Sequence, residues 1–115
     1  MSRNVKIYQV KRDLDEDTRR NISFMSYDWG IKKIPDLFTN RFNEIYELIY
    51  EFEDTEDLDK KGVAYLDGVL WSRFNFREDN PPPADYRGHR LSTSDVIALD
   101  GVRWFCDSIG WVKID

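Results

Sequence analysis

The chain has 115 residues, of which 41% are hydrophobic and 15% aromatic, and its formal net charge is −5. This length and composition predict one domain, residues 1–115, that buries a core without a metal or a disulfide. Direct nucleic-acid binding is disfavoured, because phosphate contacts need clustered Lys and Arg and the isoelectric point is near 4.9. No apolar run approaches the roughly 20 residues that cross a bilayer, and the first residues carry no signal-peptide pattern. With Cys106 as its single cysteine, the chain is expected to be cytoplasmic, with no membrane partner.

Charge is distributed unevenly along the chain. Residues 1–33 hold eight basic and five acidic side chains, whereas residues 44–59 hold eight acids and no base. A solvated acidic face is one interpretation of that segment. The other is a surface that meets a basic partner or imitates the phosphate spacing of a nucleic acid.

The first third of the chain predicts a strand, a loop and a short helix. Residues 4–10 favour a strand, because Val5, Ile7 and Gln9 alternate with the side chains between them. Residues 11–20 are almost wholly charged and are expected to form a mobile loop. Ser26 is a helix N-cap candidate, so we expect a helix over residues 26–33 that ends near Pro35.

The middle of the chain is ambiguous. A helical stripe and a strand alternation can both be drawn through residues 38–52, and the residues alone favour a helix slightly. After the acidic segment, Val63, Leu66, Leu70 and Phe74 fall on one helical face and predict a helix over residues 63–75. The Asp67-Gly68 pair within it is also a hairpin-turn signal.

The C-terminal third predicts a rigid spacer and a β-meander. Three consecutive prolines at residues 81–83 exclude a regular element there. Strands are expected over residues 94–99, 102–107 and 111–114, separated by an Asp100-Gly101 turn and a turn over residues 108–110.

Two motifs in this region resemble the YodL-like domain family. They are Arg-Gly-His-Arg-Leu-Ser-Thr-Ser-Asp-Val at residues 87–96 and Cys-Asp-Ser-Ile-Gly-Trp-Val at residues 106–112. Weaker matches precede them, including Ile-Tyr-Gln-Val at residues 7–10 and Phe-Met-Ser-Tyr-Asp-Trp at residues 24–29. The resemblance implies a domain of phages and mobile elements of Gram-positive bacteria, with no established enzymatic activity, and it favours a strand over residues 46–52. Arg90 and the extra prolines depart from the expected pattern.

Chemistry at the lone histidine has two interpretations. His89 shares its third of the chain with Asp85, Ser92, Ser94, Asp95 and Asp107, so a Ser-His-Asp arrangement can be written down. A Gly-x-Ser-x-Gly nucleophile turn is absent from the sequence, and the short polar side chains also serve to shape a turn. One His and one Cys do not supply a structural zinc site, so no metal and no cofactor are expected.

Surface contacts are the remaining interpretation. Arg87, His89 and Arg90 form a small basic cluster that could meet a carboxylate or phosphate of a partner. Alternation sends Trp104 and Phe105 to opposite faces of the meander, and the helix over residues 63–75 covers only one of them. An exposed Trp is a common component of interaction hot spots.

These observations predict an α+β fold: a small antiparallel sheet with a C-terminal β-meander and one or two helices packed on one face. The expected function is non-enzymatic. We expect the chain to be a protein-binding domain of a phage or mobile element that modulates its host. It could act, for instance, as an anti-restriction or anti-CRISPR-like inhibitor of a nucleic-acid-handling enzyme. The alternatives are a small hydrolase or transferase that uses His89 with Asp95 or Asp107, and a structural accessory domain of a larger assembly. The candidate partner-binding residues are Glu47, Glu51, Glu53, Asp54, Glu56, Asp57, Arg87, His89, Arg90 and Trp104.

Overall fold

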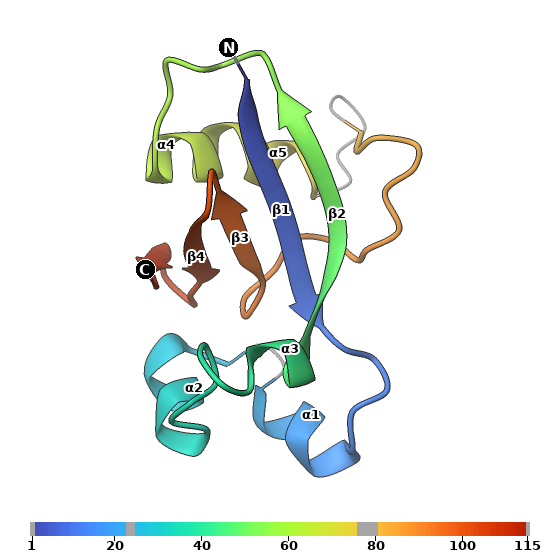
Figure 1. Ribbon diagram of the computed structural model, residues 1–115, viewed down its shortest axis with the longest axis vertical. Helices are drawn as coiled ribbons and strands as arrows, with labels where there is room; N and C mark the ends of the chain where they lie inside the picture. The colour runs from blue at the N-terminus through green and yellow to red at the C-terminus, as the bar shows by residue number, and fades with distance from the viewer. Residues whose placement is uncertain (1, 23–24, 76–80, 115) are drawn as a thin grey trace.

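A computed structural model describes residues 2–22, 25–75 and 81–114 as an antiparallel sheet with short helices (Figure 1). The five strands lie in the order β2-β1-β3-β4-β5. Their bounds are Arg3–Val10 for β1, Tyr46–Asp54 for β2, Val96–Leu99 for β3, Val102–Cys106 for β4 and Trp111–Lys113 for β5. The predicted α+β class, with its antiparallel sheet and C-terminal meander, is confirmed.

Strand β1 organises the sheet because it pairs with partners from both halves of the chain. It is antiparallel to β2 on one side and to β3 on the other, with Ile7 opposite Tyr50 and Ile97. Val5 and Ile7 have no exposed surface, as the β-branched alternation predicts. The strand therefore joins distant segments of the sequence into one sheet.

The ambiguous middle segment contains both elements. Helix α3 spans Phe42–Ile45, and β2 follows it directly. Strand β2 also carries a β-bulge, since Ile7 pairs with Tyr50 and the next residue, Tyr8, pairs with Leu48. Ile49 is the extra residue, and it interrupts the alternation of side chains along β2.

The prediction of a mobile loop over residues 11–20 is wrong for its second half, where helix α1 spans Glu16–Ile22. Asp15 stabilises the start of α1, because its Oδ2 accepts a 3.0 Å hydrogen bond from the Thr18 N–H. Acids in the first turn and Arg19 and Arg20 in the last follow the order that suits the helix dipole. The buried anchor of the helix is Ile22, which lies beyond the charged run.

The helix expected after Ser26 is confirmed as α2, Tyr27–Lys33. The Ser26 hydroxyl caps it by accepting a 3.3 Å hydrogen bond from the Trp29 N–H. Gly30 faces the core, where an added β-carbon would lie 2.7 Å from the Met25 sulfur.

The helix predicted over residues 63–75 is confirmed as a continuous helical segment. It consists of α4, Val63–Tyr65, a π-helical turn, Leu66–Leu70, and α5, Trp71–Arg73. Asp67 and Gly68 lie inside the π turn and form no hairpin. Residues 81–83 belong to no helix or strand, as their prolines predict.

The meander turns where its sequence indicates. Asp100 and Gly101 have φ values of 49° and 87°, the left-handed pair that a two-residue hairpin requires. Strand β3 starts at Val96, two residues later than predicted, because Ser94 has a φ of 83° and breaks the extended backbone.

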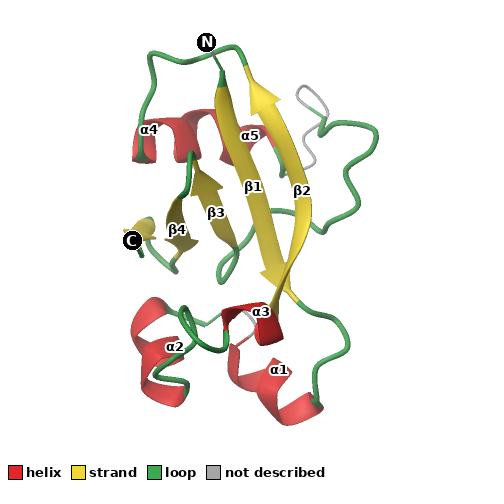
Figure 2. Ribbon diagram, in the orientation of Figure 1, coloured by secondary structure: helices red, strands yellow, loops and turns green. Residues whose placement is uncertain are grey.

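Two apolar cores lie on opposite faces of the sheet. The helix-side core packs α4–α5 against one face and consists of Val5, Ile7, Tyr65, Leu66, Val69, Leu70, Phe74, Leu91, Ile97 and Leu99. The end core consists of Ile22, Met25, Ile34, Leu37, Phe38, Phe42, Ile45, Tyr46, Val96 and Phe105. Figure 2 shows α1, α2 and α3 gathered at one end of the sheet, away from α4 and α5. Consecutive residues of β3, such as Val96 and Ile97, therefore belong to different cores.

Candidate functional site

A buried polar cluster attaches the loop over residues 85–95 to the sheet, and Gln9 of β1 is its centre. Gln9 is only 1% exposed. Its Nε2 lies 3.1 Å from the Tyr86 hydroxyl, 3.1 Å from the His89 carbonyl and 3.2 Å from Asp95 Oδ2. Its Oε1 accepts a 3.2 Å hydrogen bond from the His89 N–H. An amide nitrogen carries two hydrogens, so these acceptors share them.

Asp95 is the buried ionisable group of this cluster. Its side chain is 1% exposed, and its Oδ2 also accepts a 2.9 Å hydrogen bond from the Ser92 N–H. Burial raises the pKa of Asp95 to about 8, although the hydrogen bonds from Ser92 and Gln9 favour the carboxylate. The neutral carboxylic acid therefore prevails at pH 7.

His89 lies beside Asp95 with one edge of its ring open to solvent. Its Nε2 is 3.8 Å from Asp95 Oδ1, and its side chain is 47% exposed. Nδ1 lies 2.6 Å from the Arg90 carbonyl oxygen and 3.3 Å from Gln9 Nε2, and a hydrogen on Nδ1 satisfies the shorter of these contacts because a carbonyl oxygen only accepts. In the neutral ring Nε2 is then the acceptor, and it faces the protonatable carboxyl.

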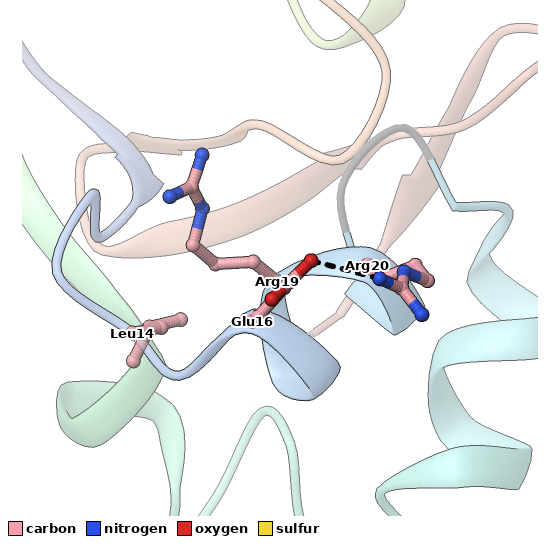
Figure 3. Close-up of a pocket in the computed structure, with 4 residues that line it drawn as sticks. All are labelled: Leu14, Glu16, Arg19 and Arg20. Atoms are coloured by element: carbon pink, nitrogen blue, oxygen red, sulfur yellow. Dashed lines mark hydrogen bonds and ion pairs between the residues drawn. The ribbon is translucent and has the colours of Figure 1, made fainter.

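Basic side chains surround this pair at a depression of about 180 Å³. Lys11 and Arg12, which follow β1, and Arg19 of α1 line it together with His89 and Asp95. Arg19 also lines a larger depression of about 500 Å³ around α1. Figure 3 shows Arg19 and Arg20 extending in different directions from α1, with Arg20 joined to Glu16 by a 2.9 Å ion pair.

A strained residue positions Asp95. Ser94 is buried and has a φ of 83°, a left-handed conformation that is uncommon for residues other than Gly. Its N–H donates to the Cys106 carbonyl at 2.8 Å, and its carbonyl accepts from the Tyr46 hydroxyl at 2.7 Å. These bonds hold the backbone in a conformation that costs about 1–3 kcal/mol.

The arrangement brings an acid and an imidazole together. Ser92 and Ser94 line the same depression, and the Nδ1 of His89 lies close to the Arg90 carbonyl and the Gln9 amide. Asp107 lies apart and accepts hydrogen bonds from the N–H groups of Tyr27 and Ser108. Of the two acids proposed to work with His89, the structure therefore brings only Asp95 to it.

Sequence reasoning missed Gln9 and Tyr86, which complete the cluster. A signal for Gln9 was present, because it continues the face of β1 that Val5 and Ile7 bury. A polar side chain on a buried face needs a polar partner. For Tyr86 no comparable signal exists, since it lies in a loop whose path depends on the whole fold.

The acids of β2 do not form one surface. Residues opposite each other in a ladder project to the same face, and the register pairs Glu47 with Gln9, Glu51 with Lys6 and Glu53 with Asn4. Glu47 therefore lies on the face of the polar cluster, whereas Glu51 and Glu53 lie on the opposite face. The bulge at Ile49 causes this separation.

Asp54 is an internal residue rather than part of an acidic surface. It is 6% exposed, and its Oδ2 accepts a 2.5 Å hydrogen bond from the Tyr65 hydroxyl. Its Oδ1 accepts a 2.9 Å hydrogen bond from the Glu56 N–H. Glu56 itself is exposed, and Asp57 is half-buried with a φ of 55°.

The other predicted residues are distributed between the loop and the meander. Arg87 and Arg90 are exposed on either side of His89. Trp104 is half-buried and packs against the helix-side core, whereas Phe105 lies in the end core. The prediction that these two side chains project to opposite faces is confirmed. Phe105 is buried in the end core, so neither side chain is fully exposed.

An apolar surface that the sequence did not indicate lies where the helix meets the end of the meander. We call Trp71 and Trp111, together with Ile109 in the turn that precedes Trp111, the tryptophan surface. The Trp71 and Trp111 rings meet edge to face at 6.4 Å, and Ile109 is 92% exposed. The Trp111 Nε1–H donates to Asp67 at 2.6 Å. Both indoles line a depression of about 310 Å³, together with Asp67 and Asp107.

We also looked at the residues that could bind a metal ion or act as a reactive thiol. No group of three or more His, Cys, Asp or Glu side chains within residues 2–22, 25–75 and 81–114 could hold a metal ion. Burial raises the pKa of Cys106 to about 12, so its thiol stays protonated. None of the helices in the described parts of the chain is long and apolar enough to cross a membrane.

A comparison with known proteins places most of the chain in a protein family. The model of the YodL-like domain family matches residues 4–115. No curated protein and no solved structure matches the chain.

Proposed function

Because the chain belongs to the YodL-like domain family, we propose that it is a non-enzymatic protein-binding domain of a phage or mobile genetic element. Its partner would be a host or element-encoded protein in the cytoplasm, and its effect would be to modulate the host. A nucleic-acid-handling defence enzyme is the partner class that an acidic domain suits best, because such enzymes carry basic surfaces.

The tryptophan surface is the observation that carries this proposal. Trp71 is 38% exposed and Ile109 is 92% exposed, so apolar surface of the kind that forms interaction hot spots is left in contact with water. The carboxylates of Asp67 and Asp107 lie at the same depression. An apolar centre flanked by acids fits a partner whose contact surface combines apolar and basic side chains.

Affinity capture from host lysate with the full chain as bait tests the tryptophan surface. We expect Trp71→Ala to lose at least about tenfold of the captured protein, since truncating a hot-spot aromatic costs about 2 kcal/mol or more. Trp29→Ala is the matched control, because Trp29 is an indole of α2 that is 43% exposed. Equal capture by both variants would remove the tryptophan surface from the proposal.

The acids of β2 are tested face by face. Glu51→Lys combined with Glu53→Lys reverses the charge of one face, and Glu47→Lys reverses it on the other. If the acids imitate the phosphates of a nucleic acid, the double variant should lose the partner, and excess duplex DNA should displace the wild-type chain from it. If the double variant still captures the partner, and if DNA does not displace the wild-type chain, the acids of β2 are a solvated surface with no role in binding. Asp54 is left unchanged because it is buried.

A small hydrolase or transferase is the second candidate, and the 3.8 Å approach of His89 Nε2 to Asp95 Oδ1 favours it. A carboxyl whose pKa is raised to about 8 could share a proton with an imidazole in general acid–base chemistry. His89→Ala decides between the candidates. Loss of biological effect with partner capture intact would support the enzyme, and full biological effect would exclude it.

A further inference from the structure

A second charged depression, of about 300 Å³, lies at the opposite end of the sheet from His89. Its lining includes three cations, Arg3 of β1, Lys61 before α4 and Lys113 of β5, together with Trp104. Asp100 is the acid at its edge, and its Oδ1 accepts a 2.8 Å hydrogen bond from the Asn4 N–H. The charges at this depression are thus three positive to one negative.

Arg3 is the distinctive group at this depression because its charge is buried. The residue is 8% exposed. Nη2 donates to the Lys60 carbonyl at 2.6 Å and approaches the Leu58 carbonyl at 3.4 Å, and the guanidinium carbon lies 4.0 Å from the centre of the Tyr65 ring. Nη1 is buried and has no hydrogen-bond partner among the described residues.

Arg3 carries a permanent positive charge that is not hydrogen-bonded to a carboxylate. Within residues 2–22, 25–75 and 81–114, the hydrogen bonds of Arg3 all go to carbonyl oxygens. Asp54 is opposite Arg3 in the β1–β2 ladder, but its carboxylate accepts hydrogen bonds from the Tyr65 hydroxyl and the Glu56 N–H. A buried guanidinium with an unused donor gains free energy from a nearby anion, because the charge is poorly screened there.

We propose that this depression binds a phosphate group. Lys61 and Lys113 are exposed, so their ammonium groups contact the phosphate, while Arg3, which also lines the depression, adds positive charge. A phosphate carries a charge of about −1.5 to −2 at pH 7 and three acceptor oxygens, which suits three cations better than a carboxylate does. This site is separate from the tryptophan surface and does not depend on the protein-binding function.

Two sources could supply the phosphate group, and Trp104 distinguishes them. The half-buried indole forms an apolar wall of the depression, on which a nucleobase could stack. Inorganic phosphate would use the cations alone. A nucleotide such as AMP would use the cations and the indole, and would bind more tightly.

Titration of the full ¹⁵N-labelled chain with inorganic phosphate and separately with AMP, at constant ionic strength, tests the site by NMR. We expect saturable shifts of the Gly62 amide and the Trp104 indole N–H, with a Kd on the order of 1 mM or below. Lys61→Ala combined with Lys113→Ala should weaken binding at least about tenfold, since two charge-assisted contacts are lost. Lys32→Ala, which changes an exposed lysine of α2, should leave binding unchanged.

The exposed lysines carry this test because a variant of the buried Arg3 could fail to fold. Tighter binding of AMP than of phosphate, lost on Trp104→Leu, would identify a nucleotide site, and equal binding would identify a site for phosphate alone. Shifts that grow linearly without saturation, or equal affinities in the double variant and in Lys32→Ala, would overturn the proposal.

Discussion

Gly88 is the residue on which the approach of the polar loop to β1 and β2 depends. A β-carbon added there would lie 2.5 Å from Gln9 Oε1, 2.6 Å from the Tyr86 hydroxyl and 2.7 Å from Ile49 Cγ2. Gly88→Ala should lower the free energy of unfolding by about 1–3 kcal/mol, as overpacking does elsewhere. Urea denaturation measures the change.

The matched control is Gly68→Ala. No atom lies within 4 Å of an added β-carbon at Gly68, which is exposed in the π-helical turn. We expect this variant to be more stable by about 0.5–1 kcal/mol, because Ala favours a helix over Gly. Loss of stability at Gly68 equal to that at Gly88 would show that the close approach of the loop is not the cause.

The carboxyl of Asp95 should make stability depend on pH. In the folded chain its pKa is raised to about 8 from an ordinary value of 3.8, so between these two values the folded state holds a proton that the unfolded state has lost. The contribution of Asp95 to the free energy of unfolding is therefore fully present below pH 4. It is lost as the pH rises to 8, by up to about 1.4 kcal/mol per pH unit.

Asp95→Asn removes this titration while keeping an oxygen that can accept from the Ser92 N–H and the Gln9 amide. Urea denaturation between pH 5 and 8 should show a weaker decline for Asp95→Asn than for the wild type. His89→Gln separates the contribution of the neighbouring imidazole. Parallel pH curves for the wild type and Asp95→Asn would contradict the buried neutral carboxyl.

At the scale of elements, the end of β2 is joined to α4 through the Asp54–Tyr65 hydrogen bond. Tyr65 is fully buried, so Tyr65→Phe leaves the Asp54 carboxylate with fewer donors and should cost about 1–3 kcal/mol in unfolding free energy. Tyr50→Phe is the comparison, since its hydroxyl donates to Asp85 at an exposed site. We expect that change to cost less than about 1 kcal/mol. Equal losses in chemical denaturation would mean that burial of the pair contributes nothing.

The elements that the sequence predicted are those whose signal is local. Strand β1 and the helix over residues 63–73 have a clear period of apolar residues, and the meander has a turn signal at Asp100 and Gly101. Helix α1 was missed because its buried residue, Ile22, lies after the charged run that argued for a loop. The bulge at Ile49 was missed because it depends on pairing with β1, and it separated acids that alternation alone placed together.

The candidate site shows the same division between local and distant information. His89 and Asp95 lie six positions apart, so a sequence motif could bring them to attention. Gln9 and Tyr86 reach the cluster from segments 77 positions apart, and only the pairing of β1 with β3 explains their contact. Arg3 was not singled out because a lone arginine at a strand end carries no sequence signal of burial.

At the scale of the whole molecule, the two cores are coupled through shared strands. Val5 and Ile7 of β1 belong to the helix-side core, whereas Tyr8, on the opposite face of β1, packs against the end core. Because both cores use β1, unfolding of this strand would disrupt both of them. We therefore expect the strands and helices of both cores to unfold in one cooperative transition.

Leu70→Ala in the helix-side core and Phe38→Ala in the end core test this coupling. Both side chains are buried, and each truncation should cost about 2–5 kcal/mol. In a Trp29→Phe background, which removes the only indole of α2, tryptophan fluorescence reports the sheet and α5, and amide exchange reports α1 and α2, so the two signals can be compared in the same urea series. In both variants they should change at the same midpoint. If Phe38→Ala instead released α1 and α2 while the fluorescence transition stayed in place, the end core would be a separate unit, and the depression at His89 and Arg19 could open without unfolding the sheet.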